Sequence, residues 1–299
     1  MAYLRLAKIQ FSVTECATAA SSPTSQVPAV ESQTDLVSAE ATATAADEFA
    51  AARTVIDYLR KRVNLDVGLT GQQRAELLAF ATLVETKLEP AILYSTWCET
   101  GAYSQYTRVA YGKQLPFPLS YYLPWSQQRS VRRKFEGTSA VQIYTEAGEA
   151  LEALANHLTA TSGSGNFFLG RQPTSLDALL FGCLAFIRGA PVVHEHLRRK
   201  LESHRSLIAY LDAIAADYFA HGVPSAAEAD VQWSQWEAAG GRHGERYSKQ
   251  KTAQEAELQR KGKIWLACAA AAIAAYVILG GQYVQFGFFE EEYEEEDED

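Results

Sequence analysis

Reactive and metal-binding side chains are scarce in this 299-residue chain, which has four cysteines, six histidines and one methionine. The cysteines, Cys16, Cys98, Cys183 and Cys268, are widely separated and form no CxxC pair. Scattered cysteines of this kind are typical of small buried hydrophobic side chains in a reducing compartment such as the cytosol. A disulfide scaffold and a cysteine metal site are therefore not expected.

The histidines lack the pattern of a metal site or a catalytic base. His194 and His196 are two residues apart, so on a helix they point to different sides. No HExxH motif, GxSxG motif or P-loop is present, and no GxGxxG follows a strand. We therefore expect a protein that is not an enzyme, with no cofactor and no metal.

Acidic side chains exceed basic ones only because of the C-terminal tail. The chain carries 36 Asp plus Glu against 27 Lys plus Arg, a formal net charge of −9. Nine of the acids lie in the last ten residues, Glu290–Asp299, so the rest of the chain is neutral. A nucleic-acid-binding protein would need a basic face, which this balance does not favour. The tail could attract basic segments of other proteins, but a solvated, disordered tail is the simpler interpretation.

Long apolar runs are missing from the N-terminal end, whereas the C-terminal region has one. MAYLRLAKIQFSV lacks the continuous apolar stretch of a signal peptide. Ile264–Val284 contains no charged side chain and has about the 20 residues that a helix needs to cross a bilayer core. Arg260, Lys261 and Lys263 precede it and acids follow it, so the positive-inside bias places the body of the chain in the cytosol. A buried core helix is the alternative, which the terminal position disfavours.

The expected transmembrane helix is only moderately hydrophobic. Its seven Ile, Leu and Val residues contribute about −2 to −4 kcal/mol to insertion, and the GGQ sequence at 280–282 opposes it. Ala267, Ala271 and Ala275 fall four residues apart on one helix face, where small side chains let another helix or a barrel wall approach closely. We therefore expect a protein partner to hold this anchor in part. The apolar anchor side chains are Ile264, Trp265, Leu266, Ile273, Tyr276, Val277, Ile278 and Leu279.

Residues 1–68 contain short elements of both kinds. Met1–Lys8 has helical spacing, and the alternation in IQFSV predicts a short strand. Val27–Val30 is expected to be extended, because a proline disfavours the helical conformation of the residue before it. A helix is expected from Asp47, with an apolar face at Phe49, Val55, Ile56 and Leu59. These strands are too few for an independent domain.

From Thr70 onward the pattern predicts helices only. The first covers Gly71–Cys98, with a kink or break at Pro90, and the second covers Gly101–Gln114. A third carries an apolar stripe at Val141, Tyr144, Leu151, Leu154 and Leu158.

The next helix, in PTSLDALLFGCLAFIRGAP, begins with a recognisable start signal. Thr174 and Asp177 have the spacing of a capping box. Two more helices are expected over 191–200 and 207–219, and the spacing in Val231–Glu237 places two tryptophans on one helix face. Arg242–Lys263 is predicted to be a basic stalk leading to the anchor.

Aromatic side chains cluster early in the helical region. Seven of them occur between Tyr103 and Trp125. Packing between helices would explain such a cluster, but tyrosine and tryptophan are also enriched in interface cores. The basic run Arg129–Lys134 that follows is either a solvated face or a contact for phosphate or lipid. The residues expected to meet a partner are Tyr103, Tyr106, Tyr121, Tyr122 and Trp125.

The order of these segments resembles the glutathione-transferase architecture and, within it, the metaxin family. The motifs that carry the resemblance lie between residues 2 and 220: AYLRLAKIQFSV, TVIDYLRKR, ELLAFATLVETKLEPAILYSTWCE, LPFPLSYYLPWSQQR and FFLGRQPTSLDALLFGCLAFI. LPFPLSYYLP and PTSLDALLFG are the most specific. The resemblance makes Pro28, Thr174 and Asp177 signatures of the fold, with Pro28 in the place of the transferase cis-proline.

The resemblance implies a mostly α fold, in which a partial, N-terminally truncated thioredoxin-like α/β region precedes an all-helical domain and a C-terminal transmembrane helix. Met1 falls inside the first helix of the thioredoxin-like region. The strand before it, and any transferase residue that activates a nucleophile, would then be missing, so a complete glutathione site is not expected. The expected segments are 1–68 (thioredoxin-like), 69–222 (all-helical), 223–263 (polar, basic stalk), 264–284 (transmembrane) and 285–299 (acidic tail).

The function implied by the resemblance is that of a non-catalytic accessory subunit of the mitochondrial outer-membrane sorting and assembly machinery, which supports insertion of β-barrel proteins and protein import. Its partners would be the barrel-forming assembly subunit, a second metaxin-like subunit, β-barrel precursors and the lipid bilayer, with no nucleic acid. The expected location is the mitochondrial outer membrane, with a single span, a cytosolic body and the tail in the intermembrane space. A membrane-anchored glutathione transferase and a tail-anchored adaptor or tether are the alternatives.

Overall fold

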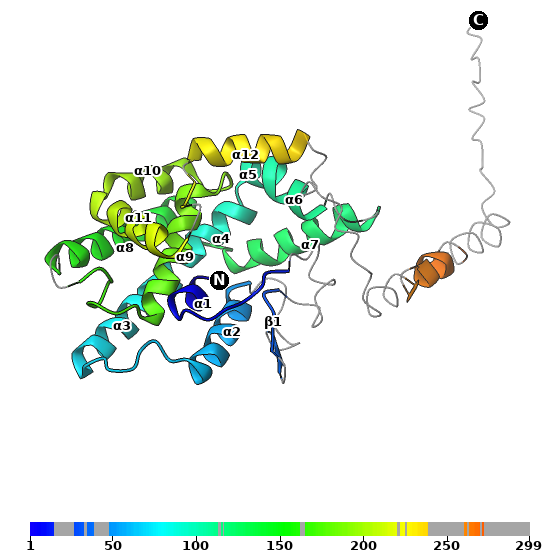
Figure 1. The fold of residues 1–299 in the computed structure, drawn as a ribbon. Helices are drawn as coiled ribbons and strands as arrows, with labels where there is room; N and C mark the ends of the chain where they lie inside the picture. The colour runs from blue at the N-terminus through cyan, green and yellow to red at the C-terminus, as the bar shows by residue number, and fades with distance from the viewer. Residues whose placement is uncertain are drawn as a thin grey trace, which may run out of the picture. The chain divides into compact units, whose positions relative to one another are not determined.

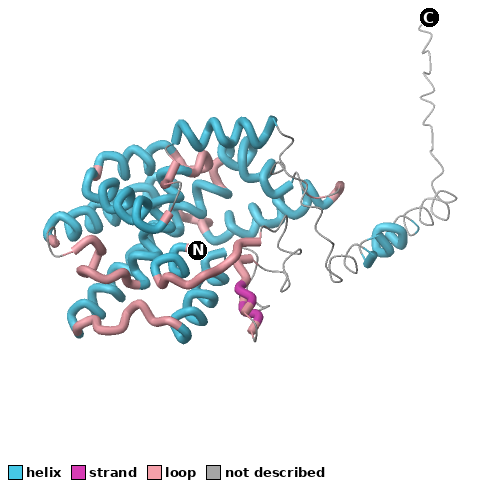
Figure 2. Tube along the Cα trace, in the orientation of Figure 1, coloured by secondary structure: helices cyan, strands magenta, loops and turns pink. Residues whose placement is uncertain are grey.

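Helices make up most of the described part of the chain (Figure 1, Figure 2). The computed structural model describes residues 1–14, 27–32, 35–38, 48–112, 115, 117–161, 165–219, 222–224, 226–238, 260–261, 263–269 and 271. Backbone contacts divide the chain into two units, Met1–Glu245 and Arg246–Asp299. The mostly helical fold expected from the sequence is confirmed.

The N-terminal part consists of short elements that attach to the helical body. Helix α1 (Ala2–Leu6) packs against helix α9, and its Tyr3 and Leu6 side chains are buried. Strands β1 (Val30–Glu31) and β2 (Leu36–Val37) pair antiparallel, and helix α2 (Glu48–Arg62) follows. This is the only sheet among the described residues.

The prediction of a strand at IQFSV is wrong, because residues 9–13 have no regular secondary structure. Lys8 has a φ of 53°, in the left-handed region, and the Ile9 N–H donates to the Leu4 carbonyl at 2.9 Å. The chain therefore turns as it leaves α1. Within the described residues, no neighbouring strand is available to pair with the alternating side chains that follow.

The first long helical stretch runs through Pro90 without a break. It consists of α3 (Gly71–Leu83), a π-helical turn η2 (Val84–Leu88) and α4 (Glu89–Trp97). Pro90 has no N–H to donate within the helix, and the wider turn directly before it accommodates this. The kink or break expected at Pro90 is thus replaced by a π-helical turn.

The second stretch is built in the same way. It consists of α5 (Thr100–Ala102), a π-helical turn η3 (Tyr103–Thr107) and α6 (Arg108–Gly112). Helix α7 (Leu119–Lys134) follows it and was not predicted. Three prolines lie between residues 116 and 124, and proline is unfavourable in the interior of a helix.

Five helices complete the body: α8 (Ala140–Ala160), α9 (Ser175–Gly189), α10 (Glu195–Ser203), α11 (Arg205–Tyr218) and α12 (Ala226–Ala238). The helix expected over 191–200 begins later, because His194 is its N-cap and accepts from the His196 N–H at 3.2 Å. On α8, the prediction that Val141 belongs to the apolar stripe is wrong. Val141 is exposed, whereas Ile143 and Tyr144 are buried.

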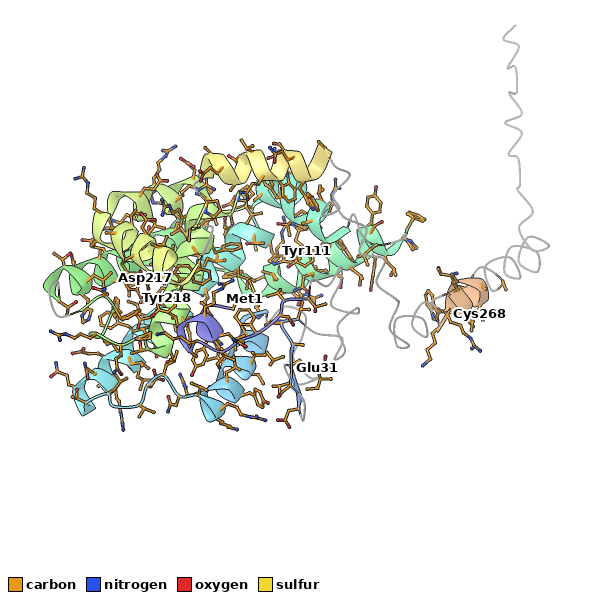
Figure 3. All side chains as sticks on the ribbon, in the orientation of Figure 1. Met1, Glu31, Tyr111, Asp217, Tyr218 and Cys268 are labelled. Atoms are coloured by element: carbon orange, nitrogen blue, oxygen red, sulfur yellow. The ribbon has the colours of Figure 1, made fainter. Side chains whose placement is uncertain are left out.

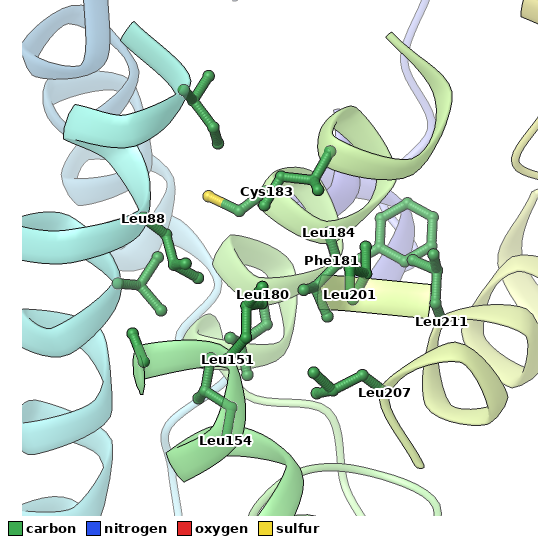
Figure 4. Packing of buried hydrophobic residues seen from close by; sticks show 14 of the residues in the cluster. Leu88, Leu151, Leu154, Leu180, Phe181, Cys183, Leu184, Leu201, Leu207 and Leu211 are labelled. Atoms are coloured by element: carbon green, nitrogen blue, oxygen red, sulfur yellow. The ribbon is translucent and has the colours of Figure 1, made fainter. Parts of the chain in front are cut away.

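The hydrophobic core is centred on α8, α9, α10 and α11, where leucines from each helix interdigitate (Figure 4). The side chains of α1 and α2 belong to the same cluster, through Tyr3, Leu6, Val55 and Leu59. The N-terminal elements therefore share one core with the helical region.

A buried carboxylate organises the start of α9. Asp177 is fully buried, and its Oδ2 accepts from the Thr174 N–H at 2.8 Å and the Thr174 hydroxyl at 2.6 Å. Its Oδ1 accepts from the Phe168 N–H at 2.8 Å and from the Tyr210 hydroxyl at 2.6 Å. The capping box expected at Thr174 is present, and its acid also holds the preceding loop and α11.

Polar contacts join the loop after α2 to the same helix end. Asp66 accepts from the Ser175 N–H and the Ser175 hydroxyl, both at 2.8 Å, and the Arg60 guanidinium donates to that hydroxyl at 2.9 Å. Arg5 of α1 donates to the Tyr218 carbonyl at the end of α11, at 3.1 Å. These contacts link the N-terminal elements to the start of α9 and the end of α11.

Replacing Asp177 by Ala should lower the free energy of unfolding by about 3–5 kcal/mol, because it leaves several buried donors without an acceptor. Urea unfolding of purified protein measures this. Asp212→Ala is the matched control: Asp212 forms an exposed ion pair with Arg188, whose loss should cost at most about 1 kcal/mol. Equal costs for the two variants would contradict the role assigned to Asp177.

Candidate partner-binding surface

The five aromatic residues expected to meet a partner fall into two groups in the structure. Tyr103 and Tyr106 are half-buried between helices. The Tyr103 ring lies 6.4 Å from that of the fully buried Trp97, and the Tyr106 ring lies 5.1 Å from that of Trp233 on α12. These two tyrosines pack helices together and offer little free surface.

Tyr121, Tyr122 and Trp125 are exposed near the start of α7, by 63 %, 57 % and 49 % of their surface. Other large apolar side chains around them are exposed as well, foremost Phe117 at 79 %. Helices α6 and α7 lie side by side, and this surface occupies the end at which they join (Figure 1). We call it the aromatic tip; its members are Tyr111 (labelled in Figure 3), Phe117, Leu119, Tyr121, Tyr122, Leu123 and Trp125.

A narrow buried face holds α7 against the body. Its buried residues are Pro124, Gln128 and Val131, which recur every three to four residues. The Gln128 amide donates to the Trp97 carbonyl at 3.0 Å, and Val131 packs in a small cluster with Leu93 and Trp97. Since the remaining positions at the N-terminal end of α7 face outward, the aromatic side chains there project into solvent.

A proline, which has no backbone N–H, and a glycine, which has no Cβ, lie where α6 and α7 approach closely. Pro124 has no N–H to donate to the Ser120 carbonyl one turn before it. Gly112, at the end of α6, lies against that carbonyl, and a Cβ at this position would stand 2.6 Å from the Ser120 oxygen. A larger residue at 112 would therefore separate the helices that form the tip.

Cations follow the aromatic side chains along the exposed face of α7. The Trp125 ring lies 6.1 Å from that of Tyr122, and the Arg129 guanidinium stands over it, 5.6 Å from its centre. Arg132 and Arg133 are exposed one turn further on. The sequence from Thr100 to Phe135 contains six Lys or Arg and no Asp or Glu. The other residues of 1–238 carry 14 Lys or Arg against 24 Asp or Glu, so this segment is a local concentration of positive charge.

Sequence reasoning missed Leu119 and Leu123 as members of this surface. It counted Tyr111 and Phe117 in the aromatic cluster but not among the five residues expected to meet a partner. The available signal was the acid-free run of aromatic residues and prolines, in which apolar residues stand too close together to share one helix face. Apolar side chains on several sides of a helix end cannot all be buried, and a contiguous exposed patch marks an interaction site.

Buried ionisable groups in the described residues are arranged for structure. Burial raises the pKa of the Cys98 thiol to about 11, and burial also raises that of Cys183. Burial raises the pKa of the Tyr144 hydroxyl too, as does the neighbouring Glu99 carboxylate, to which it donates at 2.9 Å. At neutral pH these groups stay protonated, so none is a ready nucleophile.

Two shallow hollows lie elsewhere on the body. One, of about 380 Å³, is lined by residues that include Arg60, Asp66 and Arg74. The other, of about 370 Å³, is lined by residues that include Glu99, Tyr106 and His194. Of the residues predicted from the sequence to form a site, only Tyr106 lines either hollow. Among the residues that the structure describes, no three His, Cys, Asp or Glu are placed to hold a metal ion.

The other predicted site residues are placed only in part. The Val27–Pro28 peptide is cis, and Pro28 lies just before β1. Most of the expected anchor, including Ile273, Ala275, Tyr276, Val277, Ile278 and Leu279, lies outside the described residues. Its first six residues, 264–269, are helical. In the part of the chain that the structure covers, no helix is both long and apolar enough to span a membrane.

Comparison with known proteins matches most of the body. A family described as "Outer mitochondrial membrane transport complex protein" matches residues 1–128, and the family of glutathione S-transferase C-terminal domains matches residues 147–214. Metaxin-3 of Danio rerio is 34 % identical and Metaxin-1 of Macaca fascicularis 35 % identical, each over 177 residues. Metaxin-2 of Homo sapiens is 30 % identical over 171 residues.

The chain is metaxin-like. The resemblance drawn from its motifs is confirmed, and so is the glutathione-transferase-like character of its C-terminal helices. The chain spans about half the length of the first two relatives, since each match covers 55 % of either protein. For Metaxin-2 the match covers 55 % of this chain and 64 % of the relative. All members of the aromatic tip lie within the family match over 1–128, whereas Arg129, Arg132 and Arg133 follow it.

Gly112→Ala should destabilise this metaxin-like body by about 1–3 kcal/mol, because the added methyl overlaps the Ser120 carbonyl at the α6–α7 contact. Gly182→Ala is the matched control. Gly182 lies within α9 with no atom near the position of an added Cβ, so alanine there should be neutral or stabilise the helix by up to about 1 kcal/mol. Thermal unfolding of both variants measures the difference. The same sign for both would contradict the close approach at Gly112.

Proposed function

We propose that the chain is a non-catalytic accessory subunit of the mitochondrial outer-membrane sorting and assembly machinery, which supports β-barrel insertion and protein import. The observation that carries this proposal is the match of residues 1–128 to a family of outer mitochondrial membrane transport complex proteins. The metaxin names of the relatives support the same membrane and the same class of complex.

The proposal of a non-catalytic role is supported by how the polar residues of the body are used. Thr174 and Tyr210 both donate to Asp177 in the core, and Asp66 and Arg60 attach the N-terminal elements to α9. The raised pKa values of the Cys98 and Cys183 thiols make both poor nucleophiles. These groups stabilise a scaffold on which other proteins are held.

The parts of the chain take separate roles in this proposal. Residues 1–68, as a partial thioredoxin-like region, and residues 69–222, as an all-helical domain, form the cytosolic body. The body would meet the barrel-forming subunit, a second metaxin-like subunit and β-barrel precursors. Residues 223–263 would be the stalk, 264–284 the span and 285–299 an acidic tail in the intermembrane space.

The proposed span rests on sequence. Ile264–Val284 lacks charge and follows a basic flank, and its apolar residues contribute about −2 to −4 kcal/mol to insertion. Because this margin is small, contact of the Ala267–Ala271–Ala275 face with a partner helix or barrel wall would add to the hold on the membrane.

Tagged full-length protein, purified from mitochondria in mild detergent, should bring down an outer-membrane β-barrel protein and a second metaxin-like subunit. Mass spectrometry of the eluate tests this, with an unrelated tail-anchored protein of the same membrane as the control. Elution alone or as a homodimer, together with retention on glutathione resin and conjugating activity, would instead identify a membrane-anchored transferase.

Replacing Ile273 and Val277 by Arg should release the protein from mitochondria. Each arginine near the centre of a span costs about 2.5–3.5 kcal/mol, so the pair exceeds the apolar gain. Carbonate extraction measures the release, and the double variant Ile273→Val, Val277→Ile is the matched control.

Protease added to intact mitochondria should remove the wild-type body and spare the tail. Carbonate-resistant Arg variants, or a protected body, would contradict the anchor and its orientation.

A further inference from the structure

The aromatic tip is an exposed surface whose chemistry indicates what covers it. Phe117, Tyr121 and Tyr122 each expose more than half of their surface, and Leu119 and Leu123 are exposed beside them. Soluble monomers rarely leave such side chains together in water. The tip therefore needs an apolar or interfacial environment when the protein is at work.

Charge distinguishes between the candidate environments. Arg129, Arg132 and Arg133 are exposed behind the aromatic side chains, and the whole segment from Thr100 to Phe135 carries no acid. An anionic lipid surface attracts such a segment, with a gain of about fivefold in binding for each Lys or Arg near it. Tyr and Trp are also the side chains enriched at the boundary between headgroups and hydrocarbon.

The order of side chains along α7 matches the order of layers in a bilayer. Tyr122 and Trp125 come first, and Arg129 follows on the same face in direct contact with the Trp125 ring. Four residues of helix rise about 6 Å, which is close to the thickness of one headgroup layer, roughly 5–8 Å. Rings at the hydrocarbon boundary would therefore leave the guanidinium groups among the phosphates.

We propose that the aromatic tip docks on an anionic phospholipid bilayer, with its rings in the headgroup layer and Arg129, Arg132 and Arg133 at the lipid phosphates. This rests on the proposed function, which places the body beside the outer membrane. The tip is then a second attachment point besides the C-terminal span. Two weak attachments on one chain bind far more firmly than either alone and orient the body on the membrane.

The test uses the full-length chain carrying Ile273→Arg and Val277→Arg, so that the span does not dominate vesicle binding. Flotation is measured with vesicles of phosphatidylcholine alone or mixed with phosphatidylinositol. The chain should float with the mixed vesicles, less with phosphatidylcholine alone, and less as salt is added, because exposed charges are screened. Because Arg242–Lys263 is also basic and could bind anionic vesicles, the contribution of the tip is measured with variants of the tip residues.

Tyr121→Ser, Tyr122→Ser and Trp125→Ser together should weaken binding to the mixed vesicles about tenfold or more, because their apolar area no longer enters the bilayer. Arg129→Gln, Arg132→Gln and Arg133→Gln together should weaken it by a similar factor or more, and only on anionic lipid. The control is Leu78→Ser with Val141→Ser, which removes two exposed apolar side chains elsewhere on the body. It should bind as the parent does.

Equal binding by the tip variants, the control and the parent would overturn the proposal. If the tip variants bind vesicles normally but no longer bring down the β-barrel protein in the span-intact chain, the tip is a protein interface instead. Failure of the proposed function has a different signature. In that case the wild-type chain brings down no β-barrel protein, whatever the vesicle result.

Discussion

The carboxylate of Asp177 joins parts of the body that lie far apart in the sequence. It caps α9, binds the loop at Phe168 and accepts from Tyr210 on α11. Burial raises the pKa of the Tyr210 hydroxyl, and the carboxylate beside it raises it further, so this donor stays protonated. With α9 placed, α1 packs on it and Asp66 binds Ser175 at its first turn. The position of the N-terminal elements therefore depends on the same helix end.

The aromatic tip depends on irregular turns and a close helix contact in the part of the chain that leads to it. The π-helical turns η2 and η3 interrupt the helices that lead to it, and Pro124 and Gly112 together allow α6 and α7 to touch. The narrow contact of Gln128 and Val131 suffices to hold α7, which leaves its first turns free to carry exposed rings. A surface that is costly to expose in water is thus supported by a rigid helical pair.

Local signals in the sequence predicted much of this fold. The Thr174–Asp177 spacing predicted a capping box, and apolar periodicity predicted most helices after residue 70. Contacts between residues far apart in the sequence could not be predicted from these local signals. The pattern of α7 does not reveal that Gly112 lies against the Ser120 carbonyl, because this contact joins two helices. The alternation in IQFSV predicted a strand wrongly, since a strand requires a neighbour that a short sequence window cannot show. Tyr103 and Tyr106 were grouped with the exposed aromatic residues because composition does not reveal which rings pack inward.

A scaffold with a membrane-facing tip and a C-terminal span would act by position, holding assembly partners at the surface where barrels form. The most direct measurement is β-barrel assembly in mitochondria from cells depleted of this protein, followed by native electrophoresis of a newly imported barrel precursor. The account predicts slower assembly, restored by the wild-type chain, with import of a matrix precursor affected less. Unchanged assembly in depleted mitochondria would contradict it.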